Sequence, residues 1–444
     1  MDTSERAAQI RALFDDGGEA VLREAGLPGG WEQALSELSR PLPGSADALQ
    51  MLSGMREQWA ATNRLRPAIA ATRGLLRLRI ASSGHDHPDT YVELGALGAL
   101  AQRAGRVAEG GDMLVRAWEG IRRTAGGRDM RLAVVSSNVG LHYVRTGNLE
   151  EAERALEVSY RIRKDLAPAS VGHVAAQLGE VRLARGSTGE AVDLLGEALE
   201  VYRVTFGAEH PRTDNRAQAL GALLVNLGRY AEAAAVLRSV AARSDQAPAD
   251  RRAAVDFDYG VAMYHSGGSE EGLRRIEAAV RATRAMSSED GTPDRALASR
   301  VTVYAGLQLE RRRAQEAEGL LQEAVEAERR LHGEDSVQIA ERYANLGTFL
   351  AKCGRIDEAL GFLDVSASLM RSLLGDGDRR TRSVVIKQVS LLLARAKQAR
   401  ERSDQALEGM ALTRAFQLAE PVLGYTDART REIRARLERL GLST

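Results

Sequence analysis

Residues 345–363 of the chain read NLGTFLAKCGRIDEALGFL, and this stretch decides the fold. Apolar residues at helical spacing precede a glycine turn at Gly354, and a second helical stretch then opens with acidic residues followed by an alanine. The same order of residues recurs in NVGLHYVRTGNLEEAERAL at 138–156 and in ALGALLVNLGRYAEAAAVL at 219–237. Three copies of one pattern predict a repeated pair of helices joined by a short turn.

The repeat can be followed along the chain by the small residue near the start of each second helix. This residue stands at Ala68, Gly110, Ala152, Ala191, Ala233, Gly272, Ala317 and Ala359. Successive positions are 42, 42, 39, 42, 39, 45 and 42 residues apart. Such a regular period predicts one array of about eight helix pairs, in which each pair packs only on its neighbours.

The residue types indicate how the two helices of a pair pack together. Antiparallel helices approach closely only where the residues at the contact are small, so we expect glycines of the first helix to face the small residues of the second. The expected contacts are Gly140 with Ala152, Gly179 with Ala191, Gly221 with Ala233, Gly260 with Gly272, and Gly347 with Ala359.

The turn inside each pair also has a recognisable residue. Ending a helix with a left-handed backbone favours glycine, because glycine lacks a Cβ atom. The glycines expected in this role are Gly105, Gly147, Gly186, Gly228, Gly267 and Gly354. Two other pairs depart from the pattern and carry Asn63 and Arg312 at the corresponding position.

The pattern resembles the tetratricopeptide repeat, in the longer form found in kinesin light chains. Residues 228–233, GRYAEA, are similar to that family's Gly-Lys-Tyr-Glu-Glu-Ala turn, and 345–347 to its Asn-Leu-Ala stretch. The usual period is about 34 residues, and the longer period and linkers such as 206–211 are those of the light-chain form. The resemblance covers roughly 45–424 and implies an all-α fold, a right-handed superhelical solenoid whose first helices line a concave face.

The two ends of the chain fall outside this array. Residues 1–44 are predicted to form a short N-terminal helical extension, which is too short and too broken by glycine and proline to be the motor-binding coiled coil of a kinesin light chain. In 425–444, Ile433 and Leu437 lie at helical spacing among charges, which predicts a helix that caps the apolar end of the array. A dimer through an incompletely capped end is the alternative, so we expect a monomer or a weak homodimer.

The resemblance implies a binding role, and the register of the first helices gives candidate groove residues. They are Arg103, Asn138, Arg145, Asn226, Phe257, Tyr264, His265 and Asn345. Asparagine amides can hydrogen-bond an extended peptide backbone, and arginines can hold carboxylates. The three aromatic residues of this set cluster in one helix pair, where they either anchor a partner or pack between pairs.

Sequence motifs for catalysis are missing. None of the four lysines follows a glycine, so there is no phosphate-binding loop. A single cysteine, Cys353, excludes an intrachain disulfide framework and a zinc site built from several cysteines. His85 and His87 have the nearest spacing to a metal pair, but they precede Pro88 in a linker, which favours a turn. We therefore predict no enzyme, no cofactor and no metal.

The charge balance limits the classes of partner that we expect. Lys+Arg 61 against Asp+Glu 61 gives no net charge, so neither nucleic acid nor an anionic membrane is expected as a partner. The first residues lack the basic and apolar pattern of a signal sequence, and no uncharged apolar run reaches about 18 residues, so we expect no signal sequence, no membrane span and a cytoplasmic protein. The excess of arginine over lysine is typical of a GC-rich, bacterial genome. The main hypothesis is a non-enzymatic scaffold or adaptor that binds a peptide or protein segment. A peptide-sensing module acting on a separate output protein, or less favourably an enzyme built on the solenoid, are the alternatives.

Overall fold

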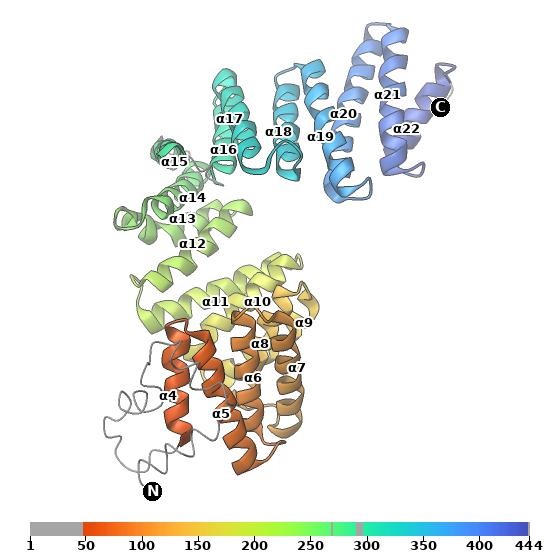
Figure 1. Cartoon of the computed structure of the whole chain (residues 1–444). Coiled ribbons are helices and arrows are strands. Elements are labelled where there is room, and N and C mark those ends of the chain that lie inside the picture. Colours follow the sequence, from red (N-terminus) through yellow and green to blue (C-terminus); the bar gives the residue numbers. More distant parts are fainter. Residues whose placement is uncertain (1–47, 268–269, 290–295, 443–444) are drawn as a thin grey trace. The chain divides into compact units, whose positions relative to one another are not determined.

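The computed structural model describes residues 48–267, 270–289 and 296–442, and every regular element in these ranges is helical (Figure 1). There are 19 α-helices, α4 to α22, in the described part, and the predicted all-α fold is confirmed. The chain divides into two compact units, Met1–Leu223 and Leu224–Thr444. The predicted N-terminal extension, 1–44, lies outside the described residues.

The N-terminal unit is built from antiparallel helix pairs in chain order: α4 with α5, α6 with α7, α8 with α9, and α10 with α11. Each pair also packs on the next one, through α5 and α6, α7 and α8, and α9 and α10. The helices are α4 (Ala48–Ala61), α5 (Leu65–Ser83), α6 (Pro88–Arg103), α7 (Val107–Thr124), α8 (Met130–Arg145), α9 (Leu149–Leu166), α10 (Val171–Ala184), α11 (Thr188–Phe206) and the start of α12 (Pro211–Asn226), with a 3-10 turn, η1 (Pro168–Ser170), before α10.

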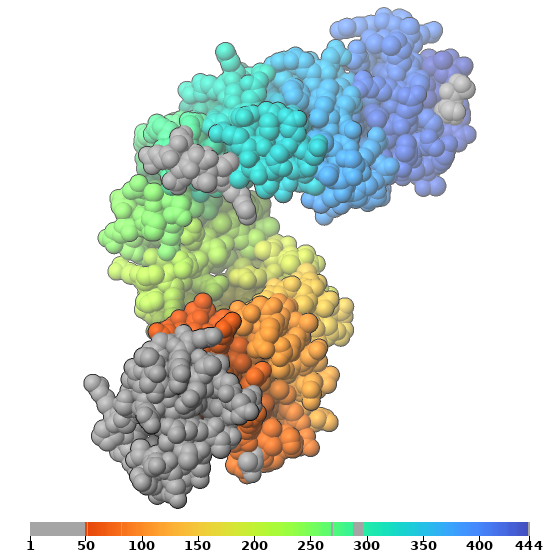
Figure 2. Space-filling model, in the orientation of Figure 1, coloured from red at the N-terminus to blue at the C-terminus, as the bar shows by residue number. Residues whose placement is uncertain are grey.

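The C-terminal unit continues the same arrangement, with α14 and α15, α16 and α17, α18 and α19, and α20 and α21 as pairs. In the space-filling view, α18 to α22, drawn in blue, pack without a break (Figure 2). The helices are α13 (Tyr230–Ala242), α14 (Ala249–Gly267), α15 (Glu270–Glu289), α16 (Leu297–Glu310), α17 (Ala314–His332), α18 (Val337–Lys352), α19 (Ile356–Leu374), α20 (Arg379–Glu401), α21 (Gln405–Leu423) and α22 (Ala428–Arg439), with a 3-10 turn, η2 (Ser244–Gln246), before α14.

Four of the five predicted close contacts inside the pairs are present, those made by Gly140, Gly179, Gly260 and Gly347. A Cβ atom added to Gly347 would lie 2.9 Å from the carbonyl oxygen of Ala359, and one added to Gly260 would lie 2.8 Å from that of Gly272. All eight small residues that mark the repeat are buried. The small side chains therefore set the distance between the two helices of each pair, as the sequence predicts.

The turns inside the pairs also follow the prediction, with one exception. Gly147 and Gly354 both have a φ of 79°, and the non-glycine residues Asn63 and Arg312 adopt the same left-handed region with φ of 57° and 61°. Gly267 was expected to do so too, but this prediction is wrong, because α14 continues through Gly267 and its φ is not positive.

The linkers between helix pairs carry a motif that the repeat analysis overlooked. The Oγ1 atom of Thr90 donates a 2.8 Å hydrogen bond to the carbonyl oxygen of Gly84, and Thr213 makes the same 2.8 Å bond to Gly207. Both linkers read Gly-x-x-His-Pro-x-Thr. In each, the histidine Nδ1 accepts a backbone N–H at the start of the next helix, so His87 caps a helix in the turn that was predicted there.

Helix α22 packs on α21 through the apolar face that the sequence indicates. The side chains of Ile433 and Leu437 are 0% and 1% exposed and belong to the core formed by α18 to α22. Nearby, Arg436 and Glu408 form an ion pair of 3.1 Å that is itself largely buried. None of the described helices combines the length and the apolar character needed to span a bilayer.

Candidate functional site

Two of the predicted groove residues connect neighbouring helix pairs. Arg103 donates hydrogen bonds to the carbonyl oxygen of Ala60 at 2.9 Å and to Oδ1 of Asn63 at 3.3 Å, so it covers the end of α4. Arg145 donates a 2.9 Å hydrogen bond to Oε1 of Gln102 on α6. Both guanidinium groups therefore join one pair to the preceding pair.

A glutamine and a histidine extend this network, and the sequence analysis missed both. The Nε2 atom of Gln102 lies 2.5 Å from Nδ1 of His142, whose ring covers the bare backbone of Gly111. Burial lowers the pKa of His142, and the charge of Arg145 lowers it further. The sequence does contain a sign of this contact, since position 111 is glycine and a Cβ atom there would collide with the ring of His142.

The three asparagines among the candidates differ in surroundings. Asn138 on α8 and Asn345 on α18 are half-buried, and neither amide makes a hydrogen bond with the described part of the chain. Asn226 is exposed at the last residue of α12. The first two amides are therefore partly dehydrated and still available to another molecule.

The aromatic candidates separate into a core residue and a surface cluster. Phe257 is 6% exposed and belongs to the core of α14 to α17, so the packing alternative describes it and it offers no surface for a partner. Tyr264 is half-buried against the same core, while His265 is exposed. The His265 ring stacks on that of Tyr230 with centroids 4.3 Å apart and meets Tyr264 edge-on at 5.3 Å.

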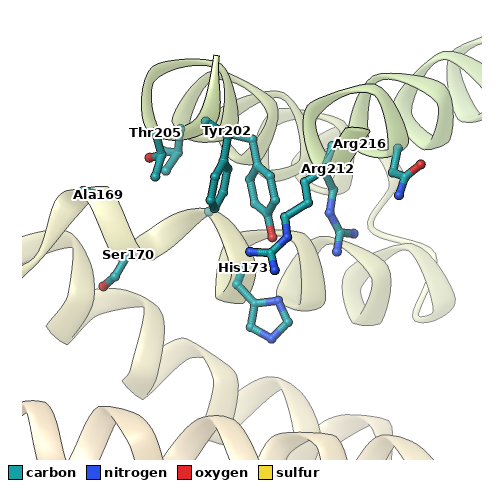
Figure 3. A pocket seen from close by; sticks show the side chains of 11 residues that line it. Ala169, Ser170, His173, Tyr202, Thr205, Arg212 and Arg216 are labelled. Carbon is teal, nitrogen blue, oxygen red and sulfur yellow. The ribbon is translucent and has the colours of Figure 1, made fainter. Parts of the chain in front are cut away.

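A cavity of about 470 Å³ lies in the N-terminal unit, where η1 and the start of α10 meet the end of α11 and the start of α12. The side chains of His173, Tyr202, Arg212 and Arg216 converge on it from these three helices (Figure 3). None of the predicted groove residues lines it. The remaining lining residues are Ala169, Ser170, Gly172, Val201, Thr205, Phe206 and Asn215.

Two aromatic rings hold the arginines of this cavity in place. Tyr202 and Phe206 lie one turn apart on α11, with ring centroids 5.4 Å apart. The guanidinium group of Arg216 lies 5.5 Å from the centroid of the Tyr202 ring, and that of Arg212 lies 5.2 Å from the centroid of Phe206. Both arrangements are cation–π contacts, which orient a guanidinium plane without neutralising its charge.

The surroundings of the cavity are positively charged. The half-buried Arg163 donates a 3.2 Å hydrogen bond to Oγ of Ser170, which lines the cavity, and burial lowers the pKa of this guanidinium. Burial also lowers the pKa of His173, followed by the charges of Arg216 and Arg163. No residue that lines the cavity is acidic, and a carboxylate of Glu180 lies 3.5 Å from Arg216 but is mostly exposed. The cavity is therefore suited to an anionic group.

Comparison with known proteins identifies the repeat. Tetratricopeptide repeat profiles match residues 90–165 and 172–246, and a further profile for the same repeat matches 339–379. The chain is a tetratricopeptide repeat protein. No curated protein matches it.

Several solved structures are similar to this tetratricopeptide protein at low identity. The apo form of RapI is 11% identical with a TM-score of 0.53, and the match covers 89% of this chain and 100% of RapI, which shows a shared fold. The apo quorum sensor NprR from B. thuringiensis is 12% identical with a TM-score of 0.49, over 83% of this chain and 99% of NprR. A Podospora anserina protein described as a kinesin light chain with nearly identical TPR-like repeats is 20% identical with a TM-score of 0.39, over 46% of this chain and 99% of its own.

Proposed function

We propose that this tetratricopeptide protein is a non-enzymatic scaffold whose first helices bind an extended segment of a partner protein. Tetratricopeptide repeats typically mediate protein or peptide interactions and are generally non-catalytic. Membership of this family therefore favours a binding role over an enzyme built on the helices.

The observation that carries the proposal is a pair of half-buried asparagine amides at one register. Asn138 and Asn345 each precede the small contact residue of their helix pair, Ala152 and Ala359, by the same 14 residues. Both are half-buried, and neither forms a hydrogen bond within the described ranges. A half-buried amide loses hydration and needs a new partner, and an extended backbone offers alternating N–H and C=O groups.

Because the two amides lie in different compact units, each is a separate contact that can be tested alone. The full chain is immobilised, partners are captured from a lysate of its source, and overlapping peptides of each captured protein are titrated by fluorescence anisotropy. Asn138→Ala and Asn345→Ala are compared with Asn148→Ala, an exposed asparagine in the turn before α9.

The proposal expects a single segment to bind and at least one of the two variants to weaken it by about ten-fold, the loss of a hydrogen bond of about 1.4 kcal/mol. The Asn148→Ala protein should bind as the wild type does. If no peptide binds, or if all three variants match the wild type, the first helices are not the binding surface and the proposal is wrong.

A further inference from the structure

Two arginines line the cavity between η1, α10, α11 and α12: Arg216 lies 3.5 Å from the mostly exposed carboxylate of Glu180, and Arg212 has no carboxylate partner in the described part of the chain. Elsewhere in the N-terminal unit, Arg131 is held by two carboxylates, those of Asp89 and Asp129, at 2.8 and 2.7 Å. At the cavity, by contrast, neither Arg163 nor Arg212 forms an ion pair with the described part of the chain. Arg163 is half-buried whereas Arg212 is exposed, and an anion entering from solvent would offset the cost of burying the unpaired guanidinium of Arg163.

Two other cavities in this unit are lined by arginines, and each of them also has one acidic residue in its lining. One, of about 640 Å³, includes Glu119 among its lining residues. The other, of about 410 Å³, includes Asp165, which pairs with Arg128 at 3.5 Å. Only the cavity at α10 to α12 combines several cationic side chains with a lining free of acidic residues, among the three cavities described.

The shape and the walls of this cavity indicate what kind of anion fits. The guanidinium groups of Arg212 and Arg216 lie over aromatic rings, which restrain them before a ligand arrives, and an arginine can donate two hydrogen bonds to a carboxylate. Val201, Tyr202 and Phe206 supply apolar walls beside them. A volume of about 470 Å³ accommodates an acidic side chain together with an apolar neighbour.

We propose that this cavity binds an aspartate or glutamate side chain of a partner protein, with an apolar side chain of the same segment against Tyr202 and Phe206. Arg212 and Arg216 hold the carboxylate. Arg163, which is hydrogen-bonded to Ser170 at the wall of the cavity, adds positive charge nearby. The inference rests on the proposed function, because it requires a protein partner, and it adds an anchor away from the two asparagines.

His173 reports on occupancy. Arg163 on α9 and Arg216 on α12 face its ring, and Gln177 on its own helix lies 3.1 Å from its Nε2 atom. A carboxylate in the cavity would offset the two positive charges, so binding should raise the pKa of His173 and become tighter as the pH falls.

The test uses the full chain labelled with ¹⁵N-histidine, so that NMR follows the His173 ring during titration. The probe is the capped peptide Gly-Glu-Leu-Glu-Phe-Gly, and the matched probe replaces both glutamates by glutamine. The expected result is a saturable shift of the His173 signal with the acidic peptide and binding about ten-fold weaker with the glutamine peptide.

Variants locate the binding. Arg212→Gln and Arg216→Gln should each weaken the acidic peptide by about ten-fold, whereas Arg154→Gln should not, because Arg154 is exposed on α9 and pairs with Glu150 and Glu151. Arg216→Lys keeps the charge but loses the planar fork, so an intermediate affinity is expected. Circular dichroism melting of each variant shows whether it is folded.

The proposal is overturned if the glutamine peptide binds equally well, if folded Arg212→Gln and Arg216→Gln proteins bind as the wild type does, or if inorganic phosphate but not the peptide shifts His173. Its failure is distinct from that of the proposed function. Partner peptides that depend on Asn138 or Asn345 but not on the arginines would leave the scaffold proposal standing and remove the anchor.

Discussion

The hydroxyl group of Thr213 donates a 2.8 Å hydrogen bond to the carbonyl oxygen of Gly207, and the same bond joins Thr90 to Gly84. Both threonines are buried, at 2% and 4% exposure. Thr381 occupies the equivalent place in the linker that follows Gly375 and is fully buried, but its hydroxyl has no hydrogen-bond partner in the described part of the chain. The same position thus holds a satisfied hydroxyl in two linkers and an unsatisfied one in two others, at Thr381 and at Thr430 after Gly424.

This difference predicts opposite effects of one substitution. Thr213→Val removes a hydrogen bond and leaves a carbonyl without that donor, so it should lower the free energy of unfolding by about 1–2 kcal/mol. Thr381→Val removes only an unsatisfied hydroxyl and should be neutral or stabilising. Urea unfolding followed by circular dichroism checks both, and equal losses in the two variants would contradict the explanation.

Arg312 adopts a left-handed backbone with φ of 61° at a turn where other helix pairs have glycine. Arg312→Gly should therefore raise the free energy of unfolding by about 1 kcal/mol, since the strain of the Cβ atom is removed. Gly354→Ala at the corresponding turn, where φ is 79°, should lower it by a similar amount. A destabilised Arg312→Gly protein would show that the arginine side chain makes a contact more valuable than the strain it causes.

Two glycines of neighbouring helices provide a matched pair. A Cβ atom on Gly347 of α18 would lie 2.9 Å from both the Ala359 carbonyl oxygen and Cγ of Leu363, whereas one on Gly361 of α19 would meet nothing within 4 Å. Gly347→Ala should destabilise the fold by about 1–3 kcal/mol through overpacking. Gly361→Ala should stabilise it by about 0.5–1 kcal/mol, because alanine is the better helix former. Thermal melting of both variants tests whether close packing of α18 and α19 explains why one substitution destabilises the protein and the other stabilises it.

Asp258 on α14 predicts a dependence of stability on pH. Burial raises its pKa from 3.8 to about 6, against the opposing charge of Arg300. The folded state therefore holds this proton more tightly than the unfolded state, and the stability contributed by the protonated form is present below pH 3.8 and lost as the pH rises through 6. Relative to Asp258→Asn, the wild type should lose roughly 3 kcal/mol across that interval. Urea unfolding of both proteins between pH 4 and 8 measures the difference, which would be constant if Asp258 kept its ordinary pKa.

The proposal that residues 425–444 cap the array gives a further prediction. Removing 426–444 deletes the buried Ile433 and Leu437 and exposes the apolar face of α21, so the shortened protein should aggregate or dimerise. Ile433→Asp should act in the same direction, and Arg434→Ala, at an exposed position of α22, should not. Size-exclusion chromatography with light scattering reports the result, and a monodisperse monomer of the deletion protein would refute the cap.

The helix pairs could be predicted from the sequence because their contacts repeat. Small residues such as Gly347 and Ala359 recur at a period near 42, and close packing of two helices leaves little choice of residue there. The turn residue with a left-handed backbone was predictable because it also recurs in each helix pair. Arg312 adopts this conformation although arginine does not favour it. Gly267 was mispredicted because the pattern gives the order of elements better than the residue at which a helix ends.

The candidate site was less predictable because it depends on how helix ends meet. Phe257 and Tyr264 are seven residues apart on one helical stripe, and only packing against α15 to α17 places the first in the core. The cavity at α10 to α12 combines Tyr202 and Phe206 before a linker with Arg212 and Arg216 after it. In the sequence, the two aromatic residues and the two arginines are each four residues apart and flank one linker, and this spacing could have indicated a shared site. That all four side chains face one cavity follows only from the folded helices.

The hydrogen bond from threonine to glycine lies entirely within seven consecutive residues, so each linker that contains it is attached to the end of the preceding helix by its own residues. A duplicated segment that begins at such a glycine contains both residues of this hydrogen bond, and a deleted one removes both, so neither change requires a compensating substitution elsewhere in the chain. Chains of this kind can therefore lengthen or shorten by whole helix pairs during evolution, with the number of pairs free to vary while the geometry of each junction is retained.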